Sequence, residues 1–128
     1  MSVTLTVTDI EVGNQIVEVF GTVAVASNYP TGGDTVDWTA LFGQQSVRGQ
    51  IVTTSMTDPT FGPVQASFTV QGGTPNLYNL QQGSADNNWK MRGYTSGSGG
   101  AEFTGGSAYP SSASGDKIVF YAAFRKLT

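Results

Sequence analysis

The side chains that carry most enzyme chemistry near neutral pH are missing from this chain. Its 128 residues include no His and no Cys, which excludes imidazole acid–base catalysis, thiol nucleophiles, disulfides and the usual zinc sites. Hydrolysis would then need a carboxylate pair, or Ser with Lys. Asp34 and Asp37 follow a turn, but on an extended chain their side chains point to opposite faces. We therefore expect a protein that is not an enzyme.

Two turns repeat one piece of chemistry, Gly33-Asp34 and Gly115-Asp116. Asp in such a turn accepts hydrogen bonds from nearby backbone N–H groups, and this is the interpretation we favour. Weak calcium binding at Asp34 or Asp116 is the alternative, although no EF-hand order occurs. The run Gly97-Ser98-Gly99-Gly100 is typical of a loop, because no Lys-Ser/Thr follows it to complete a phosphate cradle. No cofactor is expected.

The aromatic residues offer a binding function instead. Trp38 alternates in phase with Val36 and Ala40, which predicts burial. Trp89 stands among the polar residues 87–92 and is the better candidate for an exposed aromatic. Such a residue suits a protein interface or stacking on a sugar ring.

Charge and hydropathy restrict the partners. Six Lys and Arg against nine Asp and Glu give a net charge of −3, which disfavours nucleic acid. No apolar run is long enough for a transmembrane helix, and residues 1–8 lack the basic flank and apolar core of a secretion signal. These features predict synthesis in a cytoplasm and no membrane partner.

The elements that must position these residues are strands. Seventeen Gly and only 12% charged residues favour an all-β protein with many turns. Alternating or β-branched runs predict strands over 3–7, 15–26, 35–41, 46–54, 64–70, 77–80, 89–94 and 117–127. Gly21, inside the second run, predicts a bulge or a bend. The spacing of the turns is typical of a single-domain, two-sheet β-sandwich over 1–128, jelly-roll-like, with a closed β-barrel as the alternative.

Three further features concern the ends of strands. Tyr29-Pro30 and Tyr109-Pro110 each end a segment before a Gly-Asp turn, which indicates either a pseudo-repeat or recurrent turn chemistry. Residues 95–100 are expected to form the tip of a loop. The last strand, 117–127, is apolar on both faces, as in a central strand or one covered by a partner.

A resemblance rests on four pieces of the sequence: Gly21-Thr22-Val23; Asn28 to Asp37; Tyr109-Pro110; and the segment from Gly115 to Lys126. Together they resemble small structural proteins of tailed bacteriophages, of the capsid decoration (cement) type. These turn and strand motifs cover about a quarter of the chain and leave residues 44–100 without a counterpart.

The resemblance implies a β-rich virion protein on the capsid surface, made in the host cytoplasm. Its partners would be the major capsid protein and two further copies of itself, in a homotrimer. Phe124 on the last strand would then lie near the subunit contact. The N-terminal strand, or the loops at Tyr29, Pro30, Tyr109 and Pro110, would face the shell. Trp89, singled out above as an exposed aromatic, is a further candidate for partner binding. A carbohydrate- or host-binding fibre or spike module is the alternative function.

Overall fold

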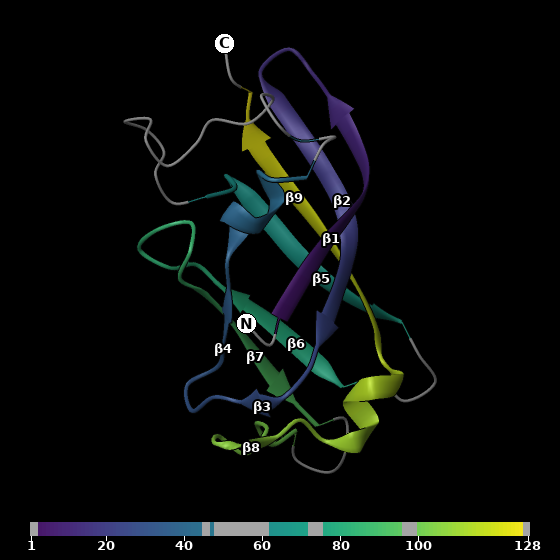
Figure 1. Cartoon of the computed structure of the whole chain (residues 1–128), viewed down its shortest axis with the longest axis vertical. Coiled ribbons are helices and arrows are strands. Elements are labelled where there is room, and N and C mark those ends of the chain that lie inside the picture. The colour runs from purple at the N-terminus through teal and green to yellow at the C-terminus, as the bar shows by residue number, and fades with distance from the viewer. Residues whose placement is uncertain (1–2, 45–46, 48–61, 72–75, 96–99, 127–128) are drawn as a thin grey trace.

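The structure, a computed structural model, describes residues 3–44, 47, 62–71, 76–95 and 100–126. Nine strands and two short 3-10 helices are found in these ranges (Figure 1). In chain order they are β1 (Val3–Val12), β2 (Ile16–Val25), β3 (Asn28–Tyr29), β4 (Asp34–Val36), η1 (Trp38–Leu41), β5 (Gln65–Gln71), β6 (Leu77–Gln81), β7 (Trp89–Tyr94), β8 (Ser107–Ala108), η2 (Ser111–Gly115) and β9 (Lys117–Arg125).

The strands form three antiparallel sheets. The largest has the order β1-β2-β9-β5, the second is β4-β7-β6, and β3 pairs with β8. None of these sheets, as described, closes into a barrel, so the predicted all-β sandwich is confirmed and the barrel alternative is wrong. β9 returns from the end of the chain to lie between β2 and β5, a long connection of the Greek-key kind.

The central position of β9 explains why its sequence is apolar on both faces. Both of its edges are paired, with β2 from Ile16↔Arg125 to Val23↔Ile118 and with β5 from Gln65↔Ala123 to Gln71↔Lys117. One face of β9 packs into the sandwich, and Tyr121 on the other is partly covered by its neighbour Phe20. The central-strand interpretation therefore holds without any partner chain.

The bulge or bend predicted at Gly21 corresponds to a β-bulge in β1, directly opposite Gly21. The register of β1 against β2 shifts between Val7 and Asp9, opposite Gly21 and Phe20. A Cβ atom on Gly21 would lie 2.1 Å from the Thr6 carbonyl oxygen and 2.4 Å from the Phe120 ring. Only glycine lets these two strands and the aromatic ring approach so closely.

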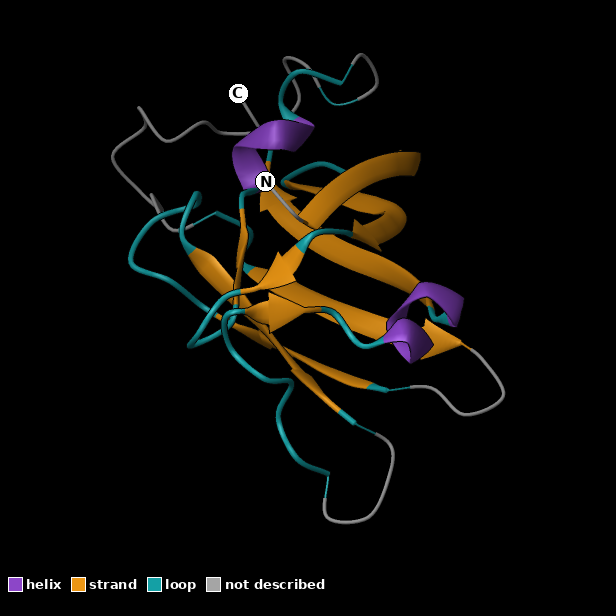
Figure 2. Ribbon diagram, turned by 60° about the horizontal axis from the view of Figure 1, so that its bottom comes forward, coloured by secondary structure: helices purple, strands orange, loops and turns teal. Residues whose placement is uncertain are grey.

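The core lies between the four-stranded and three-stranded sheets and is centred on Trp38. Its indole is fully buried and meets four aromatic rings at centroid distances of 5.6 to 6.4 Å: Trp89, Phe120, Phe124 and Phe68. The predicted burial of Trp38 is confirmed. Figure 2 shows the two 3-10 helices at opposite ends of the layered strands.

The strand predicted over 35–41 is wrong after Val36. The Asp37 side chain accepts a hydrogen bond from the Thr39 N–H at 2.9 Å and caps the 3-10 helix that begins at Trp38. A local side-chain cap of this kind competes with continued strand pairing. The strand predicted over 46–54 and the loop tip predicted over 95–100 lie mostly outside the described residues.

Among the described residues, the outer edge of β1 is paired with a side chain and not with a strand. The Val7 N–H donates to Gln44 Oε1 at 2.8 Å, and Gln44 Nε2 donates to the Leu5 carbonyl at 3.0 Å. The amide of Gln44 thus pairs with two backbone groups that an edge strand otherwise exposes.

Candidate functional site

The fold brings the two Tyr-Pro turns together at one end of the sandwich. β3 pairs with β8, matching Asn28 with Ala108 and Tyr29 with Ser107. The exposed residues of 26–32 and 104–112 form one continuous surface there, which we call the Tyr-Pro surface. In Figure 1 it lies at the bottom of the molecule, beside β3, β8 and η2.

The aromatic side chains of these turns point inward. Tyr29 is fully buried, and its ring meets Tyr109 edge-on at 5.5 Å. Phe103 lies among three tyrosines, with centroid distances of 5.4 Å to Tyr29, 5.9 Å to Tyr78 and 5.9 Å to Tyr109. Gly93 makes room for this ring, because a Cβ at that position would lie 2.3 Å from Phe103. Edge-to-face packing of this kind stabilises and orients aromatic clusters.

Each tyrosine of the cluster donates its hydroxyl to a carboxylate on a distant segment. Tyr29 donates to Glu102 Oε2 and Tyr78 to Asp116 Oδ2, both at 2.7 Å. Tyr109 donates to Asp34 Oδ2. A hydrogen bond to a charged acceptor is stronger than a neutral one. These pairs fasten the loops around the turns to the strands behind them.

Burial and these bonds raise the pKa of the Tyr29 and Tyr78 phenols, which favours their protonated forms. Burial, followed by the hydrogen bond to Glu102, raises the pKa of Tyr29 to about 12. Burial and then the bond to Asp116 raise the pKa of Tyr78 further. A phenol beside a carboxylate cannot ionise without placing two negative charges together. At neutral pH, Tyr29 and Tyr78 therefore act as hydrogen-bond donors that hold these segments together.

Asp34 and Asp116 are committed to this network. Asp34 accepts from the backbone N–H of Thr35 at 2.9 Å, as predicted for an Asp in a turn. Asp116 instead accepts from the backbone and side-chain amides of Asn76, a residue far away in the sequence. Within the described ranges, no group of three or more Asp, Glu, His or Cys side chains could hold a metal ion.

The outward side of the Tyr-Pro surface carries no charge. Its exposed residues are all small, polar or proline: Ala26, Ser27, Asn28, Pro30, Thr31, Gly32, Thr104, Gly105, Gly106, Ser107, Ala108, Ser111 and Ser112. Pro110 is half-buried at its margin. An uncharged surface is suited to contact with another protein, because charged residues are depleted from interface cores.

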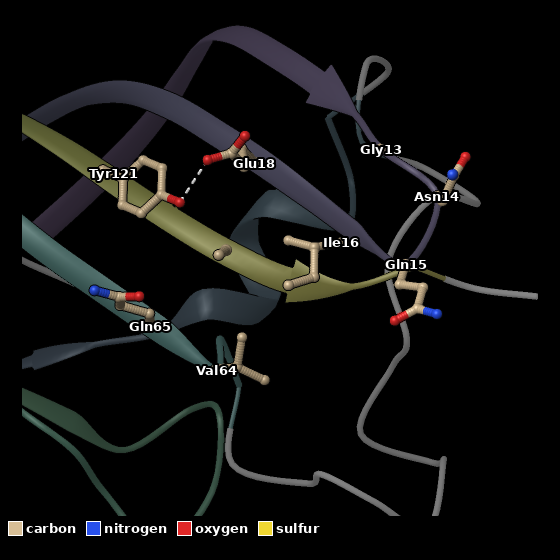
Figure 3. A pocket seen from close by; sticks show the side chains of 9 residues that line it. Gly13, Asn14, Gln15, Ile16, Glu18, Val64, Gln65 and Tyr121 are labelled. Atoms are coloured by element: carbon tan, nitrogen blue, oxygen red, sulfur yellow. Dashed lines mark hydrogen bonds between the residues drawn. The ribbon is translucent and has the colours of Figure 1, made fainter.

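A second candidate surface is a groove of about 600 Å³ on the outside of the four-stranded sheet. It follows the start of β2, the end of β9 and the start of β5 (Figure 3). Ile16, Val64 and Ala123 supply its apolar lining, and Glu18 accepts a 2.6 Å hydrogen bond from the Tyr121 hydroxyl. Asn14, Gln15 and Gln65 contribute amides to the lining.

Sequence reasoning did not single out this groove. Ile16 and Val64 are 43% and 48% exposed, although strand patterns assign such residues to the core. The alternation of β2 does indicate that Ile16 is exposed, because Ile16 is in phase with Glu18 and out of phase with the buried Val17 and Val19. Phe103 and Glu102 were also missed, because they lie outside the long regular strands.

Two predicted partner-binding residues are core residues instead. Trp89 is only 5% exposed and packs edge-on against Trp38 at 5.6 Å, so the prediction of an exposed aromatic is wrong. Its polar neighbours Lys90 and Arg92 alternate to the other face of β7. Phe124 is 1% exposed and faces Trp38. It cannot lie directly in a contact between subunits of this fold.

Two buried polar atoms near the loop before β7 have no hydrogen-bond partner among the described residues. Asp86 is 2% exposed, and its Oδ2 atom and Trp38 Nε1 are the two buried side-chain atoms without a partner among the described residues. The Asp86 backbone carbonyl accepts from the Trp38 N–H at 2.9 Å. Burial, and then the charge of Asp37, raise the pKa of the Asp86 carboxyl.

Comparisons with protein families, with curated proteins and with solved structures gave no match to this chain. In the described residues, no helix is both long and apolar enough to cross a membrane.

Proposed function

We propose that this chain is a non-enzymatic structural protein of a virion, of the capsid decoration type. It would bind the outer surface of a phage shell, as a homotrimer, and stabilise the contacts between capsomers. The resemblance of its turn and strand segments to such proteins supports this function, and the all-β sandwich is compatible with it.

The observation that carries the proposal is the Tyr-Pro surface. The two turns that carry the resemblance form one exposed, uncharged face, mounted on a buried aromatic cluster. Tyr29 and Tyr109 lie behind this face and support it through their hydrogen bonds to Glu102 and Asp34. Pro30 is exposed on its outer side. A pre-organised face loses little conformational entropy when it binds.

The cementing effect follows from linkage. A protein that binds the expanded shell, and not its unexpanded or broken forms, stabilises the expanded state by its binding free energy. Three faces held in one trimer would bind neighbouring shell subunits together and add avidity to weak single contacts.

The test is the copy number of this chain in purified, DNA-filled particles, measured by mass spectrometry against the major shell protein. We expect a copy number close to that of the major shell protein and in a simple ratio to it. A second measurement adds Thr31→Asp protein to particles that lack the chain. A charge at the centre of the docking face should weaken attachment, whereas Gln82→Glu, an exposed residue in the loop after β6, is the control. Absence of the chain from particles would exclude a virion role.

A carbohydrate- or host-binding module is the second candidate, and the groove is the observation that favours it. Tyr121, Glu18 and the amides of Asn14, Gln15 and Gln65 are side chains that bind sugar hydroxyls and rings. A glycan array with wild-type protein and a Gln65→Ala variant tests it. Specific binding that is lost in the variant would favour this function over decoration.

A further inference from the structure

The outer faces of the two main sheets carry local clusters of opposite charge. On the four-stranded sheet, Asp9 lies opposite Phe20 and Glu11 opposite Glu18, so three carboxylates share the outward side of β1 and β2. On the three-stranded sheet, the outward residues of β7 are Lys90, Arg92 and Tyr94. Opposite charges on two faces of one molecule favour pairing between unlike faces of neighbouring copies.

The charges have few partners within the chain. Arg92 makes a 3.5 Å ion pair with Glu102, and Lys90 donates to the Thr35 hydroxyl at 3.0 Å. In the parts of the chain that the structure describes, no ion pair is formed by Asp9, Glu11 or Glu18. Lys117 and Arg125 lie on the same outward side, at the two ends of β9, and Arg125 flanks Ile16 and Val64 at the groove. The carboxylates of β1 and β2 are thus available to cations of another molecule.

Exposed apolar side chains are divided between the same two faces. Ile16, Val64 and Phe20 lie in the groove or beside it, where Phe20 packs against Tyr121 at 5.4 Å. Leu77 lies on the other face and is the most exposed large apolar residue described, at 60%. It stands opposite Tyr94 and one row from Arg92. One face therefore offers a groove with a carboxylate, and the other a protruding side chain with cations.

We propose that copies of this chain associate head to tail, with Leu77 of one copy in the Ile16–Val64 groove of the next. Arg92 and Lys90 of the first copy then face Glu18, Glu11 and Asp9 of the second. This inference rests on the trimer of the proposed function and names the surfaces that join its subunits. A heterologous contact generates a closed ring when its rotation closes, and three copies related by 120° form such a ring.

A twofold contact between two grooves fits the charges less well. It brings the carboxylates of β1 and β2 of both copies to one interface, where like charges repel and Arg125 beside each groove is the nearest opposing charge. It also leaves Leu77 exposed. Since a twofold contact uses the same patch twice, the two arrangements differ in whether Leu77 is needed.

The experiment uses three full-length variants, Val64→Glu in the groove, Leu77→Glu on the opposite face, and Val12→Glu as the control. Val12 is 47% exposed, pairs with the buried Val17 and lies on the other side of the β1–β2 hairpin from the groove lining. All three residues are exposed, and circular dichroism checks that each variant is folded. Native mass spectrometry and sedimentation velocity then give the oligomeric state over a concentration series.

Wild-type protein and Val12→Glu should form the same oligomer. Val64→Glu and Leu77→Glu should each raise the dissociation constant of self-association by about 10- to 100-fold, as expected for the loss of an interface anchor. An equimolar mixture of these two variants should form dimers and nothing larger, because one intact groove meets one intact Leu77. No twofold contact predicts this complementation.

The outcomes that overturn the inference are distinct from failure of the proposed function. A monomeric wild type at the highest soluble concentration, an unchanged oligomer in Leu77→Glu, or no dimer in the mixture would each exclude the head-to-tail contact. If the protein associates as described but is missing from virions, the head-to-tail contact stands and the decoration function is excluded. If the protein is present in virions but monomeric in solution, the decoration function stands and the head-to-tail contact is excluded.

Discussion

The ring of Tyr29 meets the ring of Tyr109 edge-on, with centroids 5.5 Å apart and an interplanar angle of 81°. The two residues begin matching Tyr-Pro sequences at distant points of the chain. Each hydroxyl binds a carboxylate, Glu102 for Tyr29 and Asp34 for Tyr109. What reads as a repeat in the sequence is a contact in the fold, and this contact holds the Tyr-Pro surface in place.

Replacing Tyr29 by Phe should destabilise the protein by about 1–3 kcal/mol, because it leaves a buried donor without a partner. The Gly93 N–H donates to the Tyr29 hydroxyl at 3.1 Å, and that hydroxyl donates to Glu102. Urea unfolding measures the loss. Tyr94→Phe is the control, since the Tyr94 hydroxyl makes no hydrogen bond among the described residues. Equal stability of the two variants would contradict a structural role for the Tyr29 hydroxyl.

Replacing Gly21 by Ala should be among the most damaging small changes, with a loss above about 3 kcal/mol. The new methyl group would overlap the Thr6 carbonyl and the Phe120 ring at the β1 bulge. Gly43→Ala has nothing within 4 Å of its added carbon and should change stability by less than about 1 kcal/mol. Thermal melting of the pair compares them. A stable Gly21→Ala variant would mean that the two strands can separate at little cost.

The burial of Asp86 predicts a particular pH dependence. Its folded pKa is raised above the unfolded value of about 3.8, so the fold favours the protonated form. The stability from this group is fully present below the unfolded pKa and is lost as pH rises through the folded pKa. Asp86→Asn should therefore gain stability relative to wild type over that interval. Urea unfolding from acid to neutral pH measures the difference, with Asp9→Asn as an exposed control. A difference that does not change with pH would contradict the raised pKa.

Phe124 and Phe20 should differ sharply when each is replaced by Ala. Phe124 packs in the core against Trp38 and Phe42, so its loss should cost about 3–5 kcal/mol. Phe20 is 39% exposed and packs against Tyr121, so a loss of about 1 kcal/mol is expected. Denaturant midpoints provide the comparison. The Phe124→Asp substitution should unfold the subunit itself, and any loss of an oligomer would follow from that unfolding.

Strand positions could be predicted because alternation reports one buried face. Alternation correctly predicted that Trp38 is buried, and β5, β6 and β7 lie close to their predicted ranges. The same rule applied to Trp89, Met91 and Gly93 would have placed Trp89 in the core. Its polar neighbours in the sequence misled the prediction, since neighbours on a strand point to the opposite face. The turn that follows Val36 could not be predicted, because the cap made by Asp37 depends on a local hydrogen bond.

The site was harder to predict because it depends on contacts between distant segments. The sequence contains two Tyr-Pro pairs but no sign that they meet through β3 and β8. Phe103 lies in a short segment without alternation, and its place is defined by the missing side chain at Gly93. The groove depends on which apolar residues remain uncovered after the sheets pack. That outcome is a property of the whole fold rather than of any one strand.

The Gln44 amide on the edge of β1 has a consequence for how this domain can be reused. A carboxamide offers the same donor and acceptor as one peptide unit, so the edge of β1 ends in a substitute for a strand. Copies are thereby discouraged from merging along β1 into a continuous sheet, the route by which β-proteins form fibres. A partner at this stretch of β1 must instead recognise side chains. Recognition can then change by substitution at the surface while the backbone stays as it is.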